Sequence, residues 1–242
     1  DKENILFTEK PGKLYLLNLM MVRQMKKSPD LYWTQLAQIR LIRLSDETEF
    51  DLRQFTSYID WTNLFGNCNP VQIEVGCGKG RFLTESCNRN PDTNFIGIEN
   101  SWKYVLRTKE RLKKHNQNNA CISYVDAPYF VRHYVADHSV EAYHVYFPDP
   151  WPKDKHQKRR IFNDPIWIPE IIRTLQPGLG CLFFATDFAE YFALIEQRLA
   201  NWPQLIYQPE ISEDPNYIQT SFEIKYRDQG RPIHRAVYKL TV

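Results

Sequence analysis

Carboxylates that follow short apolar runs are the side chains of this sequence best suited to chemistry. Glu99 ends the run NFIGIE, Asp126 follows CISYV, and Asp149 follows EAYHVYF. Glu74 lies inside the run VQIEV, next to a glycine-rich segment. A carboxylate accepts hydrogen bonds from ribose hydroxyls and stabilises a neighbouring positive charge. The repeated placement of these carboxylates after apolar runs predicts a binding site for a ligand that carries both a ribose and a positive charge.

The glycine-rich segment reads EVGCGKG. Glycine lets the backbone turn tightly and approach a ligand closely. The spacing matches neither the GxGxxG pattern of dinucleotide sites nor the GxxxxGKS/T pattern of phosphate loops. S-adenosylmethionine carries a sulfonium and an ammonium group, so it suits acidic neighbours, with Glu99 on the ribose and Asp126 near the adenine edge. We therefore expect an S-adenosylmethionine site that comprises Glu74, Gly76, Gly78, Gly80, Glu99 and Asp126.

Prolines on both sides of Asp149 stiffen the segment YFPDPWP, because proline fixes φ and removes a backbone donor. The basic run KDKHQKRR starts at Lys153, directly after this turn. A basic run is more often a solvated face than a nucleic-acid site, but this one adjoins the predicted methyl-donor site. We therefore expect it to bind phosphate groups. Two roles are open for Trp151: it stacks on a base, or it packs under the loop.

Apolar runs and helical patterns alternate along the chain and would place these residues. The helices are expected at about 80–89, 102–115, 128–136, 165–176 and 187–200. The last 40 residues show no clear helix, and a closing antiparallel strand pair is expected near 204–208 and 233–241. The earlier strands are expected at 71–75, 94–98, 121–125, 141–147 and 181–186. The alternation predicts an α/β fold, a mostly parallel sheet with helices on both faces, that binds ligands beyond the carboxyl ends of its strands.

The N-terminal part of the chain does not follow this alternation. We expect a partly helical extension over residues 1–60, with one helix at 31–44, and a single domain over residues 61–242. The five cysteines show no CxxC spacing, which excludes a zinc site of that type and a disulfide framework and indicates a reducing cytoplasm. No apolar run reaches the roughly 18 residues of a membrane helix, so no membrane partner is expected. A monomer and a homodimer both stay open.

The run FPDPWPKxxHxKRR resembles the signature of the tRNA (guanine-N7)-methyltransferases, which are class I methyltransferases with a Rossmann-like fold. The resemblance covers roughly residues 60–240 and includes EVGCGKG, IGIE, VDA, ATD, TSFE and GRPIHR. It implies methyl transfer from S-adenosylmethionine to N7 of a guanine in the variable loop of tRNA, at position 46. Asp149 would be the catalytic residue and would also line the cofactor pocket. The implied tRNA-binding residues are Lys153, Lys155, His156, Lys158, Arg159, Arg160, Asp187, Thr220, Ser221, Phe222 and Glu223.

Simpler structural roles are open for several of these residues. Asp187 has the type and place of a helix N-cap, and Thr220 and Glu223 can be polar residues of a strand. His156 is interpreted as a phosphate neighbour and not as a catalyst. Ser221 departs from the family pattern, which usually has a longer polar residue there.

The predicted chemistry needs neither a general base nor a metal. N7 of guanine has a lone pair and no proton, so the main task is to align it with the methyl group. We expect Asp149 to accept hydrogen bonds from the guanine edge as the ring becomes cationic. Two alternatives remain. One is another nucleic-acid base methyltransferase, because Pro-Asp-Pro-Trp resembles the DPPY-type motif but lacks its two consecutive prolines. The other is a catalytically silent tRNA-binding subunit.

Overall fold

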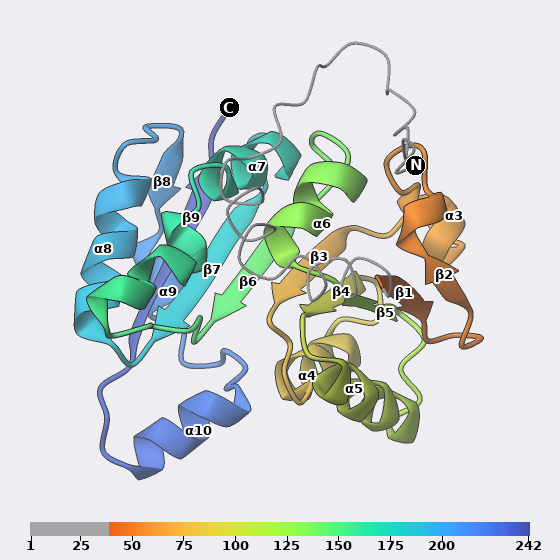
Figure 1. Ribbon diagram of the computed structural model, residues 1–242, viewed down its shortest axis with the longest axis horizontal. Coiled ribbons are helices and arrows are strands. Elements are labelled where there is room, and N and C mark those ends of the chain that lie inside the picture. Colours follow the sequence, from red (N-terminus) through yellow and green to blue (C-terminus); the bar gives the residue numbers. More distant parts are fainter. Residues whose placement is uncertain (1–38) are drawn as a thin grey trace, which may run out of the picture.

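A computed structural model describes residues 39–242 of the chain (Figure 1). Within that range a nine-stranded sheet has the order β2-β1-β5-β4-β3-β6-β7-β9-β8. Its five central strands are parallel, in agreement with the sequence prediction: β3 (Val71–Val75), β4 (Asn94–Glu99), β5 (Ala120–Tyr124), β6 (Ala142–Tyr146) and β7 (Cys181–Thr186).

Antiparallel strands flank the parallel ones at both edges. β9 (His234–Leu240) pairs with β7, and β8 (Leu205–Tyr207) pairs with β9. The closing antiparallel pair predicted from the sequence is therefore confirmed. At the other edge, β1 (Arg40–Arg43) pairs with β5, and β2 (Glu49–Asp51) pairs with β1.

Helices connect the strands and cover the sheet. The short 3₁₀ helices are η1 (Leu52–Gln54), η2 (Asp154–Arg159) and η3 (Ile161–Asn163). The α-helices of the described range are α3 (Trp61–Phe65), α4 (Arg81–Arg89), α5 (Trp102–Lys114), α6 (Ala127–Tyr134), α7 (Trp167–Thr174), α8 (Ala189–Leu199), α9 (Pro209–Ser212) and α10 (Ser221–Asp228). None of the helices in this range is long and apolar enough to cross a bilayer.

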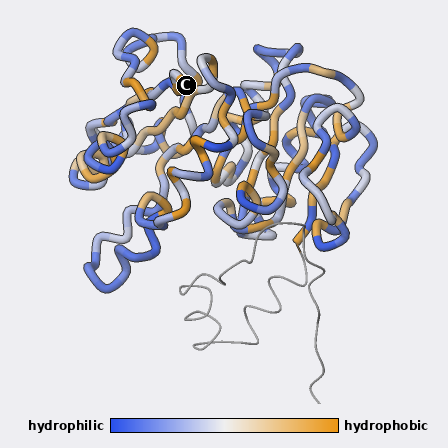
Figure 2. The backbone as a smooth tube through the Cα atoms, turned by 90° about the horizontal axis from the view of Figure 1, so that it is seen from above, coloured by the Kyte–Doolittle hydropathy of each residue, from blue (hydrophilic) through white to orange (hydrophobic). Residues whose placement is uncertain are grey.

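Two apolar cores lie on opposite faces of the sheet because successive strand residues point to opposite sides. In β4, Ile96 belongs to the core that also holds residues of α6, α7 and α8. Its neighbour Phe95 belongs to the second core, which holds Leu83 of α4 and Leu112 of α5. Hydrophobic segments accordingly run through the interior of the molecule (Figure 2). Helices therefore cover both faces, as the alternation predicted.

The helix predicted over residues 31–44 is wrong for residues 40–43, which form strand β1. Residues 31–38 lie outside the described part of the chain. Leu41 and Ile42 are both fully buried, but in different cores, and the ladder of β1 is completed by β5, about 80 residues later. That distant pairing overrides a local helical pattern. The division of the chain at residue 60 stays a prediction, and β1 and β2 share one sheet with the strands that follow.

The prediction of no clear helix in the last 40 residues is also wrong. Helix α10 begins after Thr220, whose hydroxyl accepts a hydrogen bond from the backbone N–H of Glu223 at 3.1 Å. A threonine followed three residues later by a glutamate is the sequence pattern of a capping box. Thr220 and Glu223 are therefore residues of a helix start and not of a strand.

Replacing Gly97 of β4 by alanine should destabilise the fold by about 1–3 kcal/mol. A Cβ atom there would lie 2.7 Å from Leu83 Cδ2, closer than real Cβ contacts, and 3.0 Å from Cys77 Sγ, which is also tight. Gly178→Ala is the control variant. A Cβ atom at position 178 would meet no neighbour within 4 Å, so this variant reports the cost of a left-handed φ, here 72°, without a clash. Urea unfolding monitored by circular dichroism measures both. An unchanged midpoint for Gly97→Ala would contradict this packing.

Candidate active site

The four predicted carboxylates lie at or just after the carboxyl ends of the parallel strands. These strand ends are on the side of the sheet where α10 lies (Figure 1). Glu74 is the second-last residue of β3, and Glu99 is the last residue of β4. Asp126 lies two residues after β5, and Asp149 lies three residues after β6. Because β5, β4, β3 and β6 are neighbours in this order, their carboxyl ends are adjacent. The structure thus brings these residues together.

The glycine loop is held between β4 and α5. Gly76, Gly78 and Gly80 all have positive φ, at 75°, 54° and 68°. The carbonyl of Gly78 accepts a hydrogen bond from the Thr108 hydroxyl of α5 at 2.8 Å. A Cβ atom at Gly80 would lie 2.6 Å from Thr108 Cγ2, so only glycine fits there.

Glu99 fixes the loop from the other side. Its two carboxylate oxygens accept hydrogen bonds from the backbone N–H groups of Gly78, at 3.0 Å, and Ser101, at 2.9 Å. Burial raises the pKa of Glu99, and the nearby charge of Asp149 adds to this shift. Each carboxylate oxygen accepts more than one hydrogen bond, so Glu99 keeps capacity for ligand hydroxyls.

Glu74 carries a carboxyl group that the described residues leave incompletely satisfied. The side chain is 5% exposed, and its Oε2 atom has no hydrogen-bond partner within that part of the chain. Burial raises the pKa of Glu74 to about 8, and the neighbouring Glu99 contributes to the rise. A buried carboxyl with a free oxygen beside a glycine loop fits a cationic ligand, which would supply the missing partner.

The start of α10 forms the wall opposite the glycine loop. Thr220, Ser221 and Phe222 line a pocket together with Glu74 and the glycine loop. The pocket is narrow, with a volume of about 30 Å³. The Arg81 guanidinium of α4 donates a hydrogen bond from Nε to the carbonyl of Gln219 at 3.2 Å and ties the two walls together.

Glu223 is buried and anchors this wall from within. It is 1% exposed and accepts hydrogen bonds from Arg227, at 3.0 Å, and Arg235, at 2.8 Å, as well as from the Tyr217 hydroxyl. The structure therefore places Glu223 behind the pocket, while Thr220 to Phe222 line it. The sequence analysis missed this anchoring cluster, although the capping-box spacing of Thr220 and Glu223 was visible.

The Pro-Asp-Pro-Trp turn is strained at both ends. Phe147 and Trp151 have positive φ values of 53° and 37°, which costs a non-glycine residue about 1–2 kcal/mol. Asp149, between them, is exposed. The Trp151 ring packs within the loop, edge-on to His156 at 5.6 Å and beneath the Arg159 guanidinium at 5.0 Å. Of the two roles open for Trp151, packing in the loop is the one seen in the structure.

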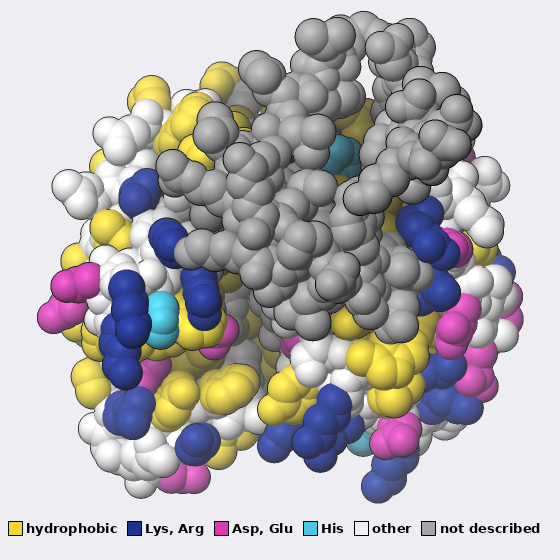
Figure 3. Space-filling view, viewed as in Figure 1, with side chains coloured by type: hydrophobic (Ala, Val, Ile, Leu, Met, Phe, Trp, Pro, Cys, Tyr) yellow, Lys and Arg dark blue, Asp and Glu magenta, His cyan; other side chains and the backbone are white. Residues whose placement is uncertain are grey.

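The side chains of the basic run differ in their exposure and do not form one continuous surface. Arg160 is only 5% exposed, and His156 is half-buried. Lys and Arg side chains gather around a His on one side of the molecule (Figure 3). The exposed cations of the run are Lys153, Lys155, Lys158 and Arg159.

Asp187 does not cap α8, contrary to the simpler role considered for it. The N-cap residue is Phe188, and Asp187 instead pairs with Arg231 at 2.7 Å. Arg231 also lies over the ring of Tyr226 at 4.8 Å, so the pair joins the end of β7 to α10. Asp187 thus lies beside the pocket wall, half-buried.

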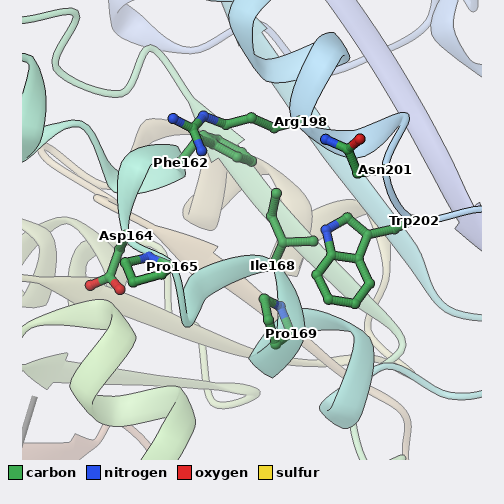
Figure 4. A pocket seen from close by; sticks show the side chains of 8 residues that line it. All are labelled: Phe162, Asp164, Pro165, Ile168, Pro169, Arg198, Asn201 and Trp202. Atoms are coloured by element: carbon green, nitrogen blue, oxygen red, sulfur yellow. The ribbon is translucent and has the colours of Figure 1, made fainter.

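A larger cavity of about 270 Å³ lies elsewhere, between α7 and the end of α8 (Figure 4). Phe162, Ile168, Arg198 and Trp202 are among the residues that line it. None of the four predicted carboxylates and no residue of the glycine loop reaches it. The volume of a cavity alone therefore does not identify the candidate active site in this fold.

Comparison with known proteins points to the same chemistry. Residues 68–236 match the model of a family described as putative methyltransferases. A tRNA (guanine-N(7)-)-methyltransferase of Rhodopirellula baltica is 37% identical over 75% of this chain and 70% of its own. The protein of the same name from Geobacter metallireducens is 36% identical over 84% of this chain and 97% of its own.

Solved structures support the fold. The 16S rRNA methyltransferase KamB has a TM-score of 0.56 at 11% identity and covers 85% of this chain and 100% of its own. The aminoglycoside resistance methyltransferase NpmB1 has a TM-score of 0.52 at 18% identity over 84% of this chain and 100% of its own. At these identities the similarity shows a shared methyltransferase fold.

Replacing Glu74 by glutamine should remove part of the pH dependence of stability. In the folded protein the pKa of Glu74 is about 8, above its value in the unfolded chain. The stability that the protonated Glu74 carboxyl contributes is therefore fully present below about pH 4 and is lost as pH rises through 8. Between pH 5 and 8 the free energy of unfolding of the wild type should therefore fall relative to Glu74→Gln, by an amount on the order of a few kcal/mol. Urea unfolding at several pH values measures this difference. If the free energies of unfolding of the wild type and of Glu74→Gln change with pH in parallel, Glu74 is ionised in the folded protein.

Proposed function

This chain belongs to the tRNA (guanine-N7-)-methyltransferase family, and on that premise we propose that it methylates N7 of a guanine in the variable loop of tRNA. S-adenosylmethionine is the proposed methyl donor and 7-methylguanosine the product. The observation that carries the proposal is the position of Asp149. It lies between the buried acids of the glycine-loop pocket and the exposed cations that begin at Lys153, so one carboxylate adjoins both a donor site and a phosphate-binding surface.

The residues that would hold the donor are those at the carboxyl ends of β3, β4 and β5. When bound, S-adenosylmethionine supplies an electrophilic methyl group attached to a sulfonium sulfur. Glu99 would accept the ribose hydroxyls, and Asp126 lies where the adenine edge would approach the end of β5. The unpaired oxygen of Glu74 would meet a cationic group of the donor. The positive φ angles of the glycines allow the backbone to come close.

Asp149 acts on the guanine. N7 needs no proton removed, so the protein has to orient the base and offset the positive charge that develops on its ring. A carboxylate held at the end of β6 accepts hydrogen bonds from the N–H groups of the guanine edge, which become stronger donors as the ring turns cationic. The strained backbone at Phe147 and Trp151 supports this proposal, because such strain is often found at functional sites.

An aromatic cluster beside Asp149 offers a surface for the base. Phe222 is 47% exposed, and its ring lies 6.0 Å from that of Tyr226 and 6.5 Å from that of Phe147. Unstacked RNA bases are commonly held against aromatic side chains, so Phe222 is the residue on which the target guanine would stack.

The phosphates of the tRNA would meet the exposed part of the basic run. Lys153, Lys155, Lys158 and Arg159 present cations beside the active-site turn, with His156 among them. Phosphate contacts of this kind position an RNA without reading its sequence. We place the reaction in the cytoplasm, where the cysteines of the chain would stay reduced.

Incubation with unmodified tRNA and methyl-labelled S-adenosylmethionine, followed by nucleoside analysis, tests the proposed function. We expect the label in 7-methylguanosine. Label in N6-methyladenosine or N4-methylcytidine would instead identify another base methyltransferase. No label, together with calorimetric binding of tRNA, would identify a silent tRNA-binding subunit.

Asp149→Asn should lower kcat by roughly 10²–10³, with a smaller change in tRNA affinity. The amide has the same size and keeps the turn, but it cannot offset the charge that develops on guanine. Single-turnover methylation and filter binding of tRNA measure the two effects separately. A variant that turns over at the wild-type rate would make Asp149 a structural turn residue.

Removing the charges of Lys155, Lys158 and Arg159 together should weaken tRNA binding and reduce its salt dependence. Each lost phosphate contact should lower the slope of log affinity against log salt by roughly 0.7–0.9. Lys109→Gln with Lys113→Gln is the matched control, because both lysines are already paired with Glu47. If the triple variant keeps the wild-type slope, the exposed run is only a solvated face.

A further inference from the structure

Arg160 differs from every other cation of the basic run. Lys153, Lys155, Lys158 and Arg159 are exposed, whereas Arg160 is 5% exposed. Its Nε atom donates a hydrogen bond to the carbonyl of Pro150 at 2.6 Å. Its guanidinium lies 4.8 Å from the ring centre of Tyr191, a fully buried residue of α8. The side chain therefore points into the protein, toward the back of the active-site turn.

The carbonyl that Arg160 holds lies inside the Pro-Asp-Pro-Trp turn. Pro150 follows Asp149, and its carbonyl belongs to the peptide group that precedes Trp151, whose φ is 37°. A left-handed conformation at a tryptophan persists only when its surroundings fix it. The prolines on either side of Asp149 fix their own φ angles, but they contribute no backbone N–H that could hold Trp151 in its conformation. The hydrogen bond from Arg160 supplies that constraint.

The main chain of Arg160 is itself held in place. Its backbone N–H donates to the carbonyl of Gln157 at 3.0 Å, and its carbonyl accepts from the backbone N–H of Asn163 at 2.9 Å. Arg160 lies where η2 ends and η3 begins. None of the ion pairs within residues 39–242 includes Arg160, so the Pro150 carbonyl and the Tyr191 ring face are the partners of its guanidinium there. With its Nε donor bound to Pro150 and only 5% of the residue exposed, Arg160 is far less accessible to a phosphate than the exposed cations of the run.

We propose that Arg160 is a positioning residue, which fixes the Pro150 carbonyl and thereby holds the Asp149 carboxylate at the end of β6. This assignment separates Arg160 from the tRNA-binding cations with which the sequence groups it. It rests on the proposed function, because Asp149 is taken to act on the guanine.

Arg160→Lys and Arg160→Gln, compared with Arg159→Gln, separate positioning from phosphate binding. Lysine keeps the charge and binds phosphate, but it lacks the planar group that stacks on Tyr191 and the Nε donor. We expect both Arg160 variants to lower kcat about 10-fold or more, while tRNA affinity and its salt slope stay at the wild-type values. Arg159→Gln should lower tRNA affinity and reduce the slope by roughly 0.7–0.9.

A double-mutant cycle tests whether Arg160 acts through Asp149. Adding Arg160→Lys to Asp149→Asn should lower kcat by less than twofold further, because the carboxylate that Arg160 positions is already gone. Full additivity would overturn the proposal, as would wild-type kcat in Arg160→Lys or a reduced salt slope in either Arg160 variant. Loss of folding in both variants would make Arg160 a core residue and would also overturn it.

Fluorine NMR of 5-fluorotryptophan protein separates this proposal from the proposed function. The Trp151 signal, assigned with Trp151→Phe, should shift or broaden in Arg160→Lys while the other tryptophan signals stay in place. An unchanged Trp151 signal would overturn the positioning role even in an active enzyme. If the wild type makes no 7-methylguanosine but the signal changes, the proposed function fails and the structural role of Arg160 stands.

Discussion

Strand order around β3 controls where every acid of the site lies. The chain passes from β3 to β4 and β5 on one side, then returns to place β6 on the other side of β3. At such a reversal the connections leave the sheet in opposite directions and open a crevice beyond the carboxyl ends of the strands. Glu74 and Glu99 lie on one side of this crevice and Asp149 on the other. The glycine loop and the Pro-Asp-Pro-Trp turn are the two connections that border it.

The site keeps its acids in an environment that disfavours their charge. Burial raises the pKa of both Glu74 and Glu99, and the charge of Glu99 raises that of Glu74 further, as the charge of Asp149 does for Glu99. In the proposed function, a cationic donor bound beside these acids would offset this penalty. The supports around the site are correspondingly rigid. Glu223 with its two arginines fixes one wall, and Arg160 fixes the turn that carries Asp149.

The central strands and the placement of the four carboxylates were predictable because both depend on local patterns. Apolar runs of strand length identify β3 to β7, and the topology of parallel sheets then places whatever follows each strand. β1 was not predictable in this way, because its ladder forms with β5, far along the chain. Helix α10 was missed in a polar segment, although Thr220 and Glu223 had capping-box spacing.

The inward direction of Arg160 was not readable from sequence either. In the run KDKHQKRR, Arg159 and Arg160 are adjacent and chemically identical, yet one is exposed and the other is buried. Only the turn between η2 and η3 decides which of them faces the protein. A basic run in a sequence therefore does not tell which of its side chains are exposed in the fold.

A crystal structure of the protein with S-adenosylhomocysteine tests the central claim most directly. The account predicts that the ribose lies on Glu99, that the amino-acid end lies beside the glycine loop near Glu74, and that the sulfur faces the crevice next to Asp149. Density for the ligand in the cavity between α7 and α8, or at the glycine loop with its sulfur directed away from Asp149, would contradict it.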